Sequence, residues 1–297
     1  QLTSSSGFVQ QADIVAAGFH SRGTMKNIYN LLFSMLNQHR HVNPDIYLAA
    51  NAEILFCTIL LSLVITYIFN DAVLYKNGIS DMVGYNNPCV FWDDPPALYF
   101  AALCFTPMVY LAIRYAVLDT QRAYLTPGLS GWWKKLIFVV NFWYAFSQAV
   151  NALIFVVTPN DGNLTHMHMH SAFFLQLVPT LGACIAMNYL EGWAAGMTVH
   201  THQWVILGVS MAFTVLETLM AATAIFGWGG YIDGDINKPS PPVIPPLLMQ
   251  FVDWGWFCSL PIVSTFDPPS PTIKIDIALE ELPEAPQTDE EAGPIKF

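Results

Sequence analysis

Charge is scarce in this sequence. Charged residues make up 11% of its 297 residues, against about 25% in soluble domains. A soluble domain of ordinary composition is therefore excluded. The 11 basic residues are outnumbered by 22 acidic ones and lie scattered along the chain, so no basic patch is present to bind nucleic acid.

Cysteine is rare and catalytic motifs are missing. Only five cysteines occur, and their spacing forms neither a disulfide framework nor a CxxC metal site. The sequence contains no nucleophile elbow, phosphate-binding loop, zinc-protease motif or desaturase-type histidine boxes. No lysine falls within an apolar block, which argues against a retinal Schiff base. We therefore expect a protein without enzymatic activity.

Long apolar blocks are what the sequence does contain. Hydrophobic residues make up 54% of the chain and gather in stretches long enough to cross a bilayer, which takes about 20 residues. Six spans are predicted: Leu48–Phe69, Ala97–Ala116, Leu136–Val157, Ala172–Tyr189, Trp204–Trp228 and Val243–Phe266. The fourth is short, and the sixth contains three prolines. The predicted fold is an all-α, polytopic membrane helical bundle.

The distribution of lysine and arginine predicts an orientation. With six spans, both termini share one side, and the opposite side carries only Lys76 and Lys238. The side of the termini carries Arg22, Lys26, Arg40, Arg114, Arg122, Lys134, Lys135, Lys274 and Lys296. Basic residues are retained on the cytoplasmic side, so both termini are expected inside. The expected location is an endomembrane or an organellar inner membrane.

Two segments flank the transmembrane domain, which is predicted over residues 48–266. Residues 1–47 include an amphipathic stretch, Thr24–Gln38, expected to form a helix on the membrane surface or against a partner. Residues 267–297 form an acidic, proline-rich tail. Its Ile273, Ile275 and Ile277 alternate with polar residues, which suits an added strand or a clamp on a neighbour. Both segments are predicted contact elements for other membrane-protein subunits.

Two carboxyl residues lie inside predicted spans, Glu217 in the fifth and Asp253 in the sixth. Ionised groups are costly in a bilayer and commonly mark function. Antiparallel neighbouring spans would bring the two to similar depth, where desolvation should keep at least one protonated. The functional interpretation is a proton or cation site. The alternative is a neutral carboxyl group that hydrogen-bonds two helices together.

The third predicted span carries a polar stripe. Asn141, Tyr144, Gln148 and Asn151 are three, four and three residues apart, so they share one helix face. This face should point toward other helices and away from lipid. Interhelical hydrogen bonding is the simplest role for it.

Histidines cluster in the run Thr165–His170, "THMHMH". On a helix, His166 and His170 would share a face able to bind zinc or copper, although a closed site usually takes four ligands. A haem would need paired histidines from neighbouring spans, but His200 and His202 begin the fifth span on the other side of the membrane. We expect no haem and no transition metal. The histidines are then polar residues at the membrane rim.

One glycosylation sequon occurs, Asn163-Leu-Thr165, on a loop predicted to lie outside. If this loop faces a secretory lumen, Asn163 could carry a glycan.

Several short motifs resemble the damage-regulated autophagy modulator (DRAM) family and its relatives in GPI-anchor lipid remodelling. These motifs are "GISDMVGYNNP" (Gly78–Pro88), "YLAIRY" (Tyr110–Tyr115), a histidine at the start of the fourth span, and Asp253-Trp254 followed by "STFDPPSPTIKID". The resemblance is scattered over Ile79–Asp276, and the proline-rich sixth span departs from the family's pattern. It implies a membrane-organising or lipid-handling protein that works through partners, with no catalytic residues.

The leading functional hypothesis is a non-catalytic multi-pass membrane protein that organises membrane lipids, with lipids bound, or partner proteins. One alternative is an accessory subunit of a large energy-transducing complex in a mitochondrion or plastid. The other is a proton-coupled transporter that uses Glu217 and Asp253.

Overall fold

Six long helices dominate the computed structural model, which describes residues 41–83, 85–158, 164–226, 245–268 and 273–274. The helices are α3 (Asp45–Phe69), α6 (Ala97–Leu125), α7 (Gly131–Asn151), α8 (Leu164–Ala194), α9 (Thr201–Phe226) and α10 (Pro246–Thr265). Each is long and apolar enough to cross a membrane, α7 together with the 3-10 turn η2 (Ala152–Phe155) that follows it. A helix satisfies its own backbone hydrogen bonds, as hydrocarbon requires. The prediction of a six-span helical membrane protein is confirmed at this level.

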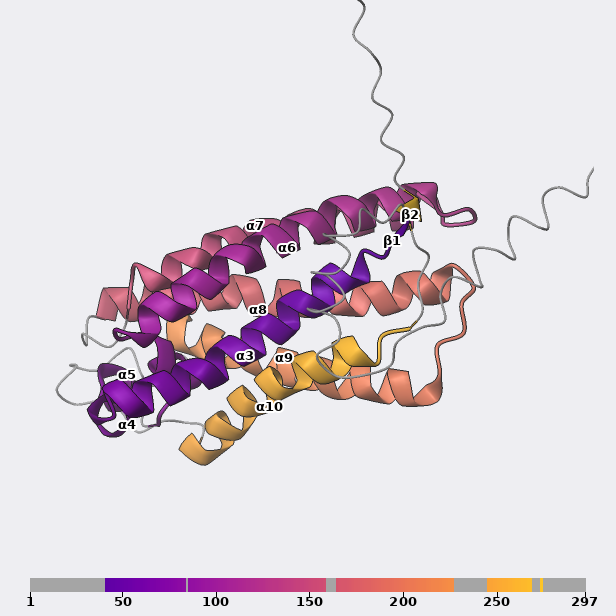
Figure 1. Ribbon diagram of the computed structural model, residues 1–297. Coiled ribbons are helices and arrows are strands. Elements are labelled where there is room, and N and C mark those ends of the chain that lie inside the picture. Colours follow the sequence, from indigo (N-terminus) through magenta and orange to yellow (C-terminus); the bar gives the residue numbers. More distant parts are fainter. Residues whose placement is uncertain (1–40, 84, 159–163, 227–244, 269–272, 275–297) are drawn as a thin grey trace, which may run out of the picture.

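The helices form a closed ring in chain order. Each packs against the next, and α10 returns to pack against α3. At one end, β1 (His41–Val42) pairs in antiparallel fashion with β2 (Ile273–Lys274). The opposite end holds α4 (Ala72–Tyr75), α5 (Gly78–Val83) and the 3-10 turn η1 (Pro88–Trp92) (Figure 1). We refer to these as the sheet end and the loop end.

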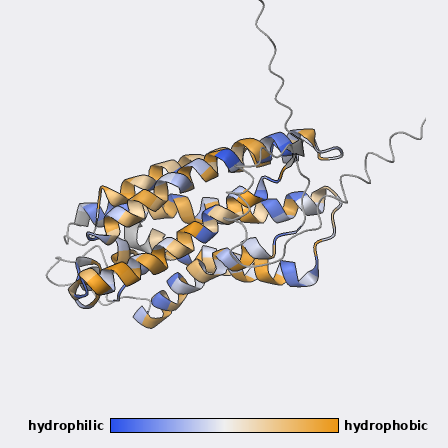
Figure 2. Ribbon diagram, in the orientation of Figure 1, coloured by the Kyte–Doolittle hydropathy of each residue, from blue (hydrophilic) through white to orange (hydrophobic). Residues whose placement is uncertain are grey.

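Apolar side chains cover both the inside and the outside of the ring. Hydrophobic residues run along all six long helices (Figure 2). Leu103 and Phe142 lie on the outer surface, 72% and 59% exposed, whereas Phe105 and Tyr144 are buried in the core. An apolar exterior suits contact with lipid, so polar side chains that face the interior are the informative ones.

The helix bounds differ most from the predicted spans in two places. Helix α6 continues nine residues past the predicted end at Ala116, and α8 begins eight residues before the predicted start at Ala172. The fourth span, predicted to be short, is the 31-residue α8. Hydropathy detects only the part of a helix that matches hydrocarbon, while the backbone hydrogen bonds continue through the polar residues at each rim. Of the three prolines of the sixth span, Pro245 is the N-cap and Pro246 begins the helix, where proline is tolerated, while Pro261 lies inside α10.

The flanking segments lie mostly outside the described residues. The predicted amphipathic helix at Thr24–Gln38 and most of the acidic tail fall outside the described residues. The first part of the alternating tail stretch is described, and there Ile273 and Lys274 add a strand to the chain's own His41–Val42. The short segments before α3 and after α10 therefore pair with each other at the sheet end.

Candidate functional site

Glu217 and Asp253 meet inside the bundle near its loop end. Glu217 lies on α9 and Asp253 on α10, and their side chains are 6% and 1% exposed. The two carboxyl groups lie close enough to interact. Two buried carboxyl groups this close do not both ionise readily, so the pair can hold one proton between them. We call these two residues the loop-end pair.

A loop outside the spans reaches down to this pair. The Tyr85 hydroxyl donates a hydrogen bond to Asp253 Oδ2 over 2.7 Å, and Asn87 Nδ2 donates to the same oxygen over 2.9 Å. Two donors from the loop stabilise the ionised form of Asp253, so the shared proton belongs mainly to Glu217. Burial, and then the neighbouring Asp253 charge, raise the pKa of Tyr85 well above its ordinary value. Tyr85 therefore acts only as a neutral donor.

The residues after Asn87 form a buried plug at the loop end. The Asn87 side chain accepts a hydrogen bond from the Cys89 backbone N–H over 2.8 Å and so starts the turn η1. All five residues of η1 are buried. The Trp92 ring contacts Phe155 and Phe257 edge-on, with ring centroids 6.0 and 6.3 Å away. Thus the loop is packed into the mouth of the bundle and separates the loop-end pair from the space beyond the spans.

A second polar site lies at the sheet end, around Arg122. Its Nη2 lies 2.8 Å from Asp45 Oδ1, contacts Asp119 and donates to Asn188 Oδ1 over 3.2 Å. Its Nε lies 3.6 Å from Glu191 Oε1. These groups come from α3, α6 and α8, and the side chains of all three acidic partners are nearly fully buried. We call Asp45, Asp119, Arg122, Asn188 and Glu191 the sheet-end network.

The sheet-end network has more carboxyl groups than cations. Glu191 lies near both Asp119 and Arg122, and neither of its carboxyl oxygens has a hydrogen-bond partner among the described residues. Asp267 approaches from the segment after α10, where burial, and then the Asp45 charge, raise its pKa well above the ordinary value. Gln203 Nε2 holds this segment by donating to the carbonyl oxygens of Phe266 and Asp267, at 2.9 and 3.2 Å. With more carboxyl groups than cations in a buried cluster, the network can also bind protons.

The polar stripe of α7 begins at this network. Asn141 Nδ2 donates to Asp119 Oδ2 over 2.7 Å, and its Oδ1 accepts from the Cys184 thiol over 3.4 Å. Tyr144, Gln148 and Asn151 follow on the same face, and all three are buried. The stripe thus runs from the sheet-end network toward the plug.

The histidines do not converge on one site. His170 is buried, stacks on Phe174 with ring centroids 5.6 Å apart and places Nδ1 3.4 Å from the Val157 carbonyl oxygen. His166 is half-buried on the same helix, at the loop end. His200 and His202 stack on each other, exposed, at the sheet end. Within the described ranges, no three His, Cys, Asp or Glu side chains are placed to hold a metal ion.

Sequence reasoning identified the loop-end pair but missed the groups that surround it. Tyr85 and Asn87 belong to a loop, and no hydrophobic pattern relates a loop to a particular helix. Asp45, Asp119 and Glu191 fall outside the predicted spans, so they were not among the predicted intramembrane charges. Asn163, the predicted glycosylation site, lies outside the described residues. Comparison of the chain with family models, with curated proteins and with solved structures finds no match.

Proposed function

We propose that this six-span protein is a proton-coupled transporter in which the loop-end pair binds the transported proton. The observation that carries the proposal is the close approach of two buried carboxyl groups, Glu217 and Asp253, inside a membrane-spanning bundle. Intramembrane carboxyl groups are costly and commonly serve as proton relays. This pair holds one proton between two groups, so it can accept or release a proton with little movement of the helices.

The second carboxyl cluster supports the same proposal. The sheet-end network gathers Asp45, Asp119 and Glu191 around one arginine at the opposite end of the ring. Proton-binding groups therefore lie toward both ends of the bundle. Arg122 supplies a fixed positive charge that offsets part of the network's negative charge, so a proton can leave without stranding unpaired carboxylates.

Reconstituted protein can test the proposal. Proteoliposomes would carry a trapped pH-sensitive dye, and an imposed pH gradient would drive proton uptake. The double variant Glu217→Gln/Asp253→Asn should abolish uptake, whereas Asp71→Asn, which changes an exposed carboxylate of the same loop end, should leave it unchanged. Unchanged uptake in the double variant, or no uptake by the unmodified protein, would contradict the proposal.

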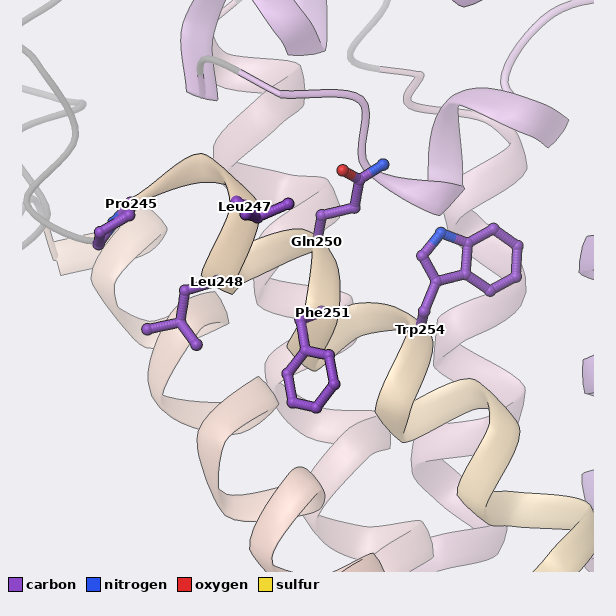
Figure 3. Close-up of a pocket in the computed structure, with 6 residues that line it drawn as sticks. All are labelled: Pro245, Leu247, Leu248, Gln250, Phe251 and Trp254. Carbon is purple, nitrogen blue, oxygen red and sulfur yellow. The ribbon is translucent and has the colours of Figure 1, made fainter.

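Lipid organisation, the leading hypothesis from the sequence, is a second candidate because α10 carries an apolar groove. Its first turns line this groove with Pro245, Leu247, Leu248, Gln250, Phe251 and Trp254 (Figure 3). Leu247 and Phe251 are 79% and 63% exposed on a membrane-spanning helix, where lipid acyl chains are the natural neighbours. This candidate fits what the DRAM resemblance implies. The accessory-subunit alternative has no observation of its own and stays a prediction.

Native mass spectrometry separates the second candidate from a bundle that is merely surrounded by lipid. A lipid retained after delipidation should be lost in Phe251→Ser but kept in Phe142→Ser, a change at an exposed phenylalanine on α7. Equal retention in both variants would exclude a specific lipid site in the groove.

A further inference from the structure

We infer that the α7 stripe binds a file of internal water molecules that leads from the sheet-end network toward the plug. As a route for protons the file rests on the proposed function, but as a binding site it can be tested without any transport. The argument depends on where the stripe lies, on which of its atoms lack partners, and on the chemistry that these atoms require.

The stripe faces the inside of the ring. Helix α7 packs between α6 and α8. At one end of the stripe, Asn141 bonds to Asp119 of α6 and to Cys184 of α8. Farther along, Phe155 meets Phe105 of α6, with ring centroids 5.3 Å apart. The face between these points is therefore enclosed by both neighbouring helices and is closed to lipid.

Most polar atoms of the stripe have no hydrogen-bond partner among the described residues. They are Tyr144 Oη, Gln148 Nε2 and both side-chain atoms of Asn151, together with the adjacent Ser147 Oγ. Each of these side chains is at most 1% exposed. A buried polar atom without a partner is strongly unfavourable, and native structures contain few of them. A group of this size on one helix face indicates that something polar binds there.

The chemistry of these atoms specifies the ligand. The two hydroxyl groups can donate and accept, Gln148 Nε2 donates, and the Asn151 amide does both. None is charged, so an ion is not favoured. Water offers two donors and two acceptors and fits sites with several polar partners. From Tyr144 to Asn151 the helix rises about 10 Å, so a short file of water molecules along this face would meet all of these groups.

Direct bonds between helices are the simpler alternative and were the prediction from the sequence. In the structure only Asn141 follows it, by bonding to Asp119 and Thr120 of α6 and to Cys184 of α8. Tyr144, Gln148 and Asn151 make no such side-chain bonds within the described part of the chain. Within the stripe, Asn141 thus joins helices, whereas Tyr144, Gln148 and Asn151 have polar atoms that can bind a small polar ligand.

Hydroxyl-radical footprinting with X-ray pulses can detect such water. Radicals formed from bound water modify buried side chains that touch it. On the full-length protein in detergent, Tyr144 should be modified at least about tenfold faster than Tyr189, because it contacts bound water. Tyr189 is the matched control, since it is equally buried but donates its hydroxyl proton to the Val263 carbonyl oxygen over 2.9 Å. Equal, slow modification of both tyrosines would overturn the inference.

A leucine variant provides a second measurement. In Gln148→Leu/Asn151→Leu, modification of Tyr144 should fall severalfold while that of Tyr189 stays the same, because the file has lost its polar partners. If the stripe were dry, removing unpartnered polar groups would raise the melting temperature and leave Tyr144 labelling unchanged.

The two proposals can be contradicted independently of each other. If Tyr144 is labelled but proton uptake does not depend on Glu217 and Asp253, the water file stands and the transporter proposal is contradicted. If Tyr144 is not labelled but proton uptake depends on Glu217 and Asp253, the transporter proposal stands and the water file is contradicted.

Discussion

Arg122 Nη2 lies 2.8 Å from Asp45 Oδ1 and thereby joins the last turn of α6 to the first residue of α3. These residues are 77 positions apart in the chain, and the same guanidinium also contacts Asp119 and Glu191. One cation therefore holds three helices together at the sheet end. Its planar set of donors suits several acceptors at once, which a lysine could not satisfy.

Replacing Arg122 with Met should strongly destabilise the bundle. The change leaves buried carboxyl groups without their cation, and breaking a buried ion pair by removing one partner costs about 3–5 kcal/mol. Thermal unfolding of the purified variant in detergent measures the loss. Lys135→Met removes an exposed positive charge at the same end and should change little. If both variants unfold like the original protein, the network is not a structural element.

Tyr85→Phe should loosen the loop without unfolding the spans. It removes the 2.7 Å bond to Asp253, and a hydrogen bond to a charged group contributes about 1.5–3 kcal/mol. Labelling of Cys89, which is buried just beyond Asn87, should become faster with a thiol reagent, as quantified by peptide mass spectrometry. Tyr75→Phe changes an exposed tyrosine of the same connection and should have no effect. Slow Cys89 labelling in both variants would mean that the tyrosine does not secure the loop.

Gly255→Ala should push α9 and α10 apart. A Cβ at this position would overlap the Phe213 ring on α9, and such overpacking typically costs about 1–3 kcal/mol. Gly208 is the matched control because a Cβ there meets nothing within 4 Å. Gly208→Ala should be neutral or stabilising by up to about 1 kcal/mol, as alanine is the better helix former. Similar melting temperatures for the two variants would show that α9 and α10 pack less closely than described.

Asp93 should make stability depend on pH. It is buried just after η1, where burial, and then the Asp94 charge, raise its pKa well above the ordinary 3.8. The folded protein therefore binds this proton more tightly than the unfolded chain. The resulting stabilisation is fully present below pH 3.8 and is lost as the pH rises through the raised pKa. Asp93→Asn keeps the shape but removes the charge.

Melting temperatures measured across a pH series would check this. The Asp93→Asn variant should be more stable than the original protein above the raised pKa, and the difference should shrink as the pH falls toward 3.8. Asp71→Asn, at an exposed site of the same end, should show no such trend. A constant difference at all pH values would rule out titration of Asp93 as the cause.

The architecture was largely predictable because apolar blocks follow from a simple requirement. A chain that crosses hydrocarbon must be helical and apolar over about 20 residues, and this constraint is local in sequence. Six such blocks gave six helices. The spacing of Asn141, Tyr144, Gln148 and Asn151 likewise placed them on one buried face, since helix periodicity is local too.

The sites were less predictable because they depend on contacts between distant segments. The apolar blocks end before Asp119 and Glu191, so hydropathy alone leaves these carboxyl groups outside the predicted spans. Helices α6 and α8 continue past those ends and turn both residues toward Arg122. No local pattern indicates that a rim charge will be enclosed by three helices.

By itself, then, the sequence determined a six-span helical membrane protein with carboxyl groups in its fifth and sixth spans. Only the tertiary structure decided that Glu217 and Asp253 touch, that Tyr85 and Asn87 reach them from outside the spans, and that Arg122 gathers carboxyl groups from three helices. The physical reason is the separation along the chain over which each effect acts. Hydropathy and helix periodicity act within about 20 residues, whereas hydrogen bonds and ion pairs at the two sites join residues brought together only by closure of the helical ring.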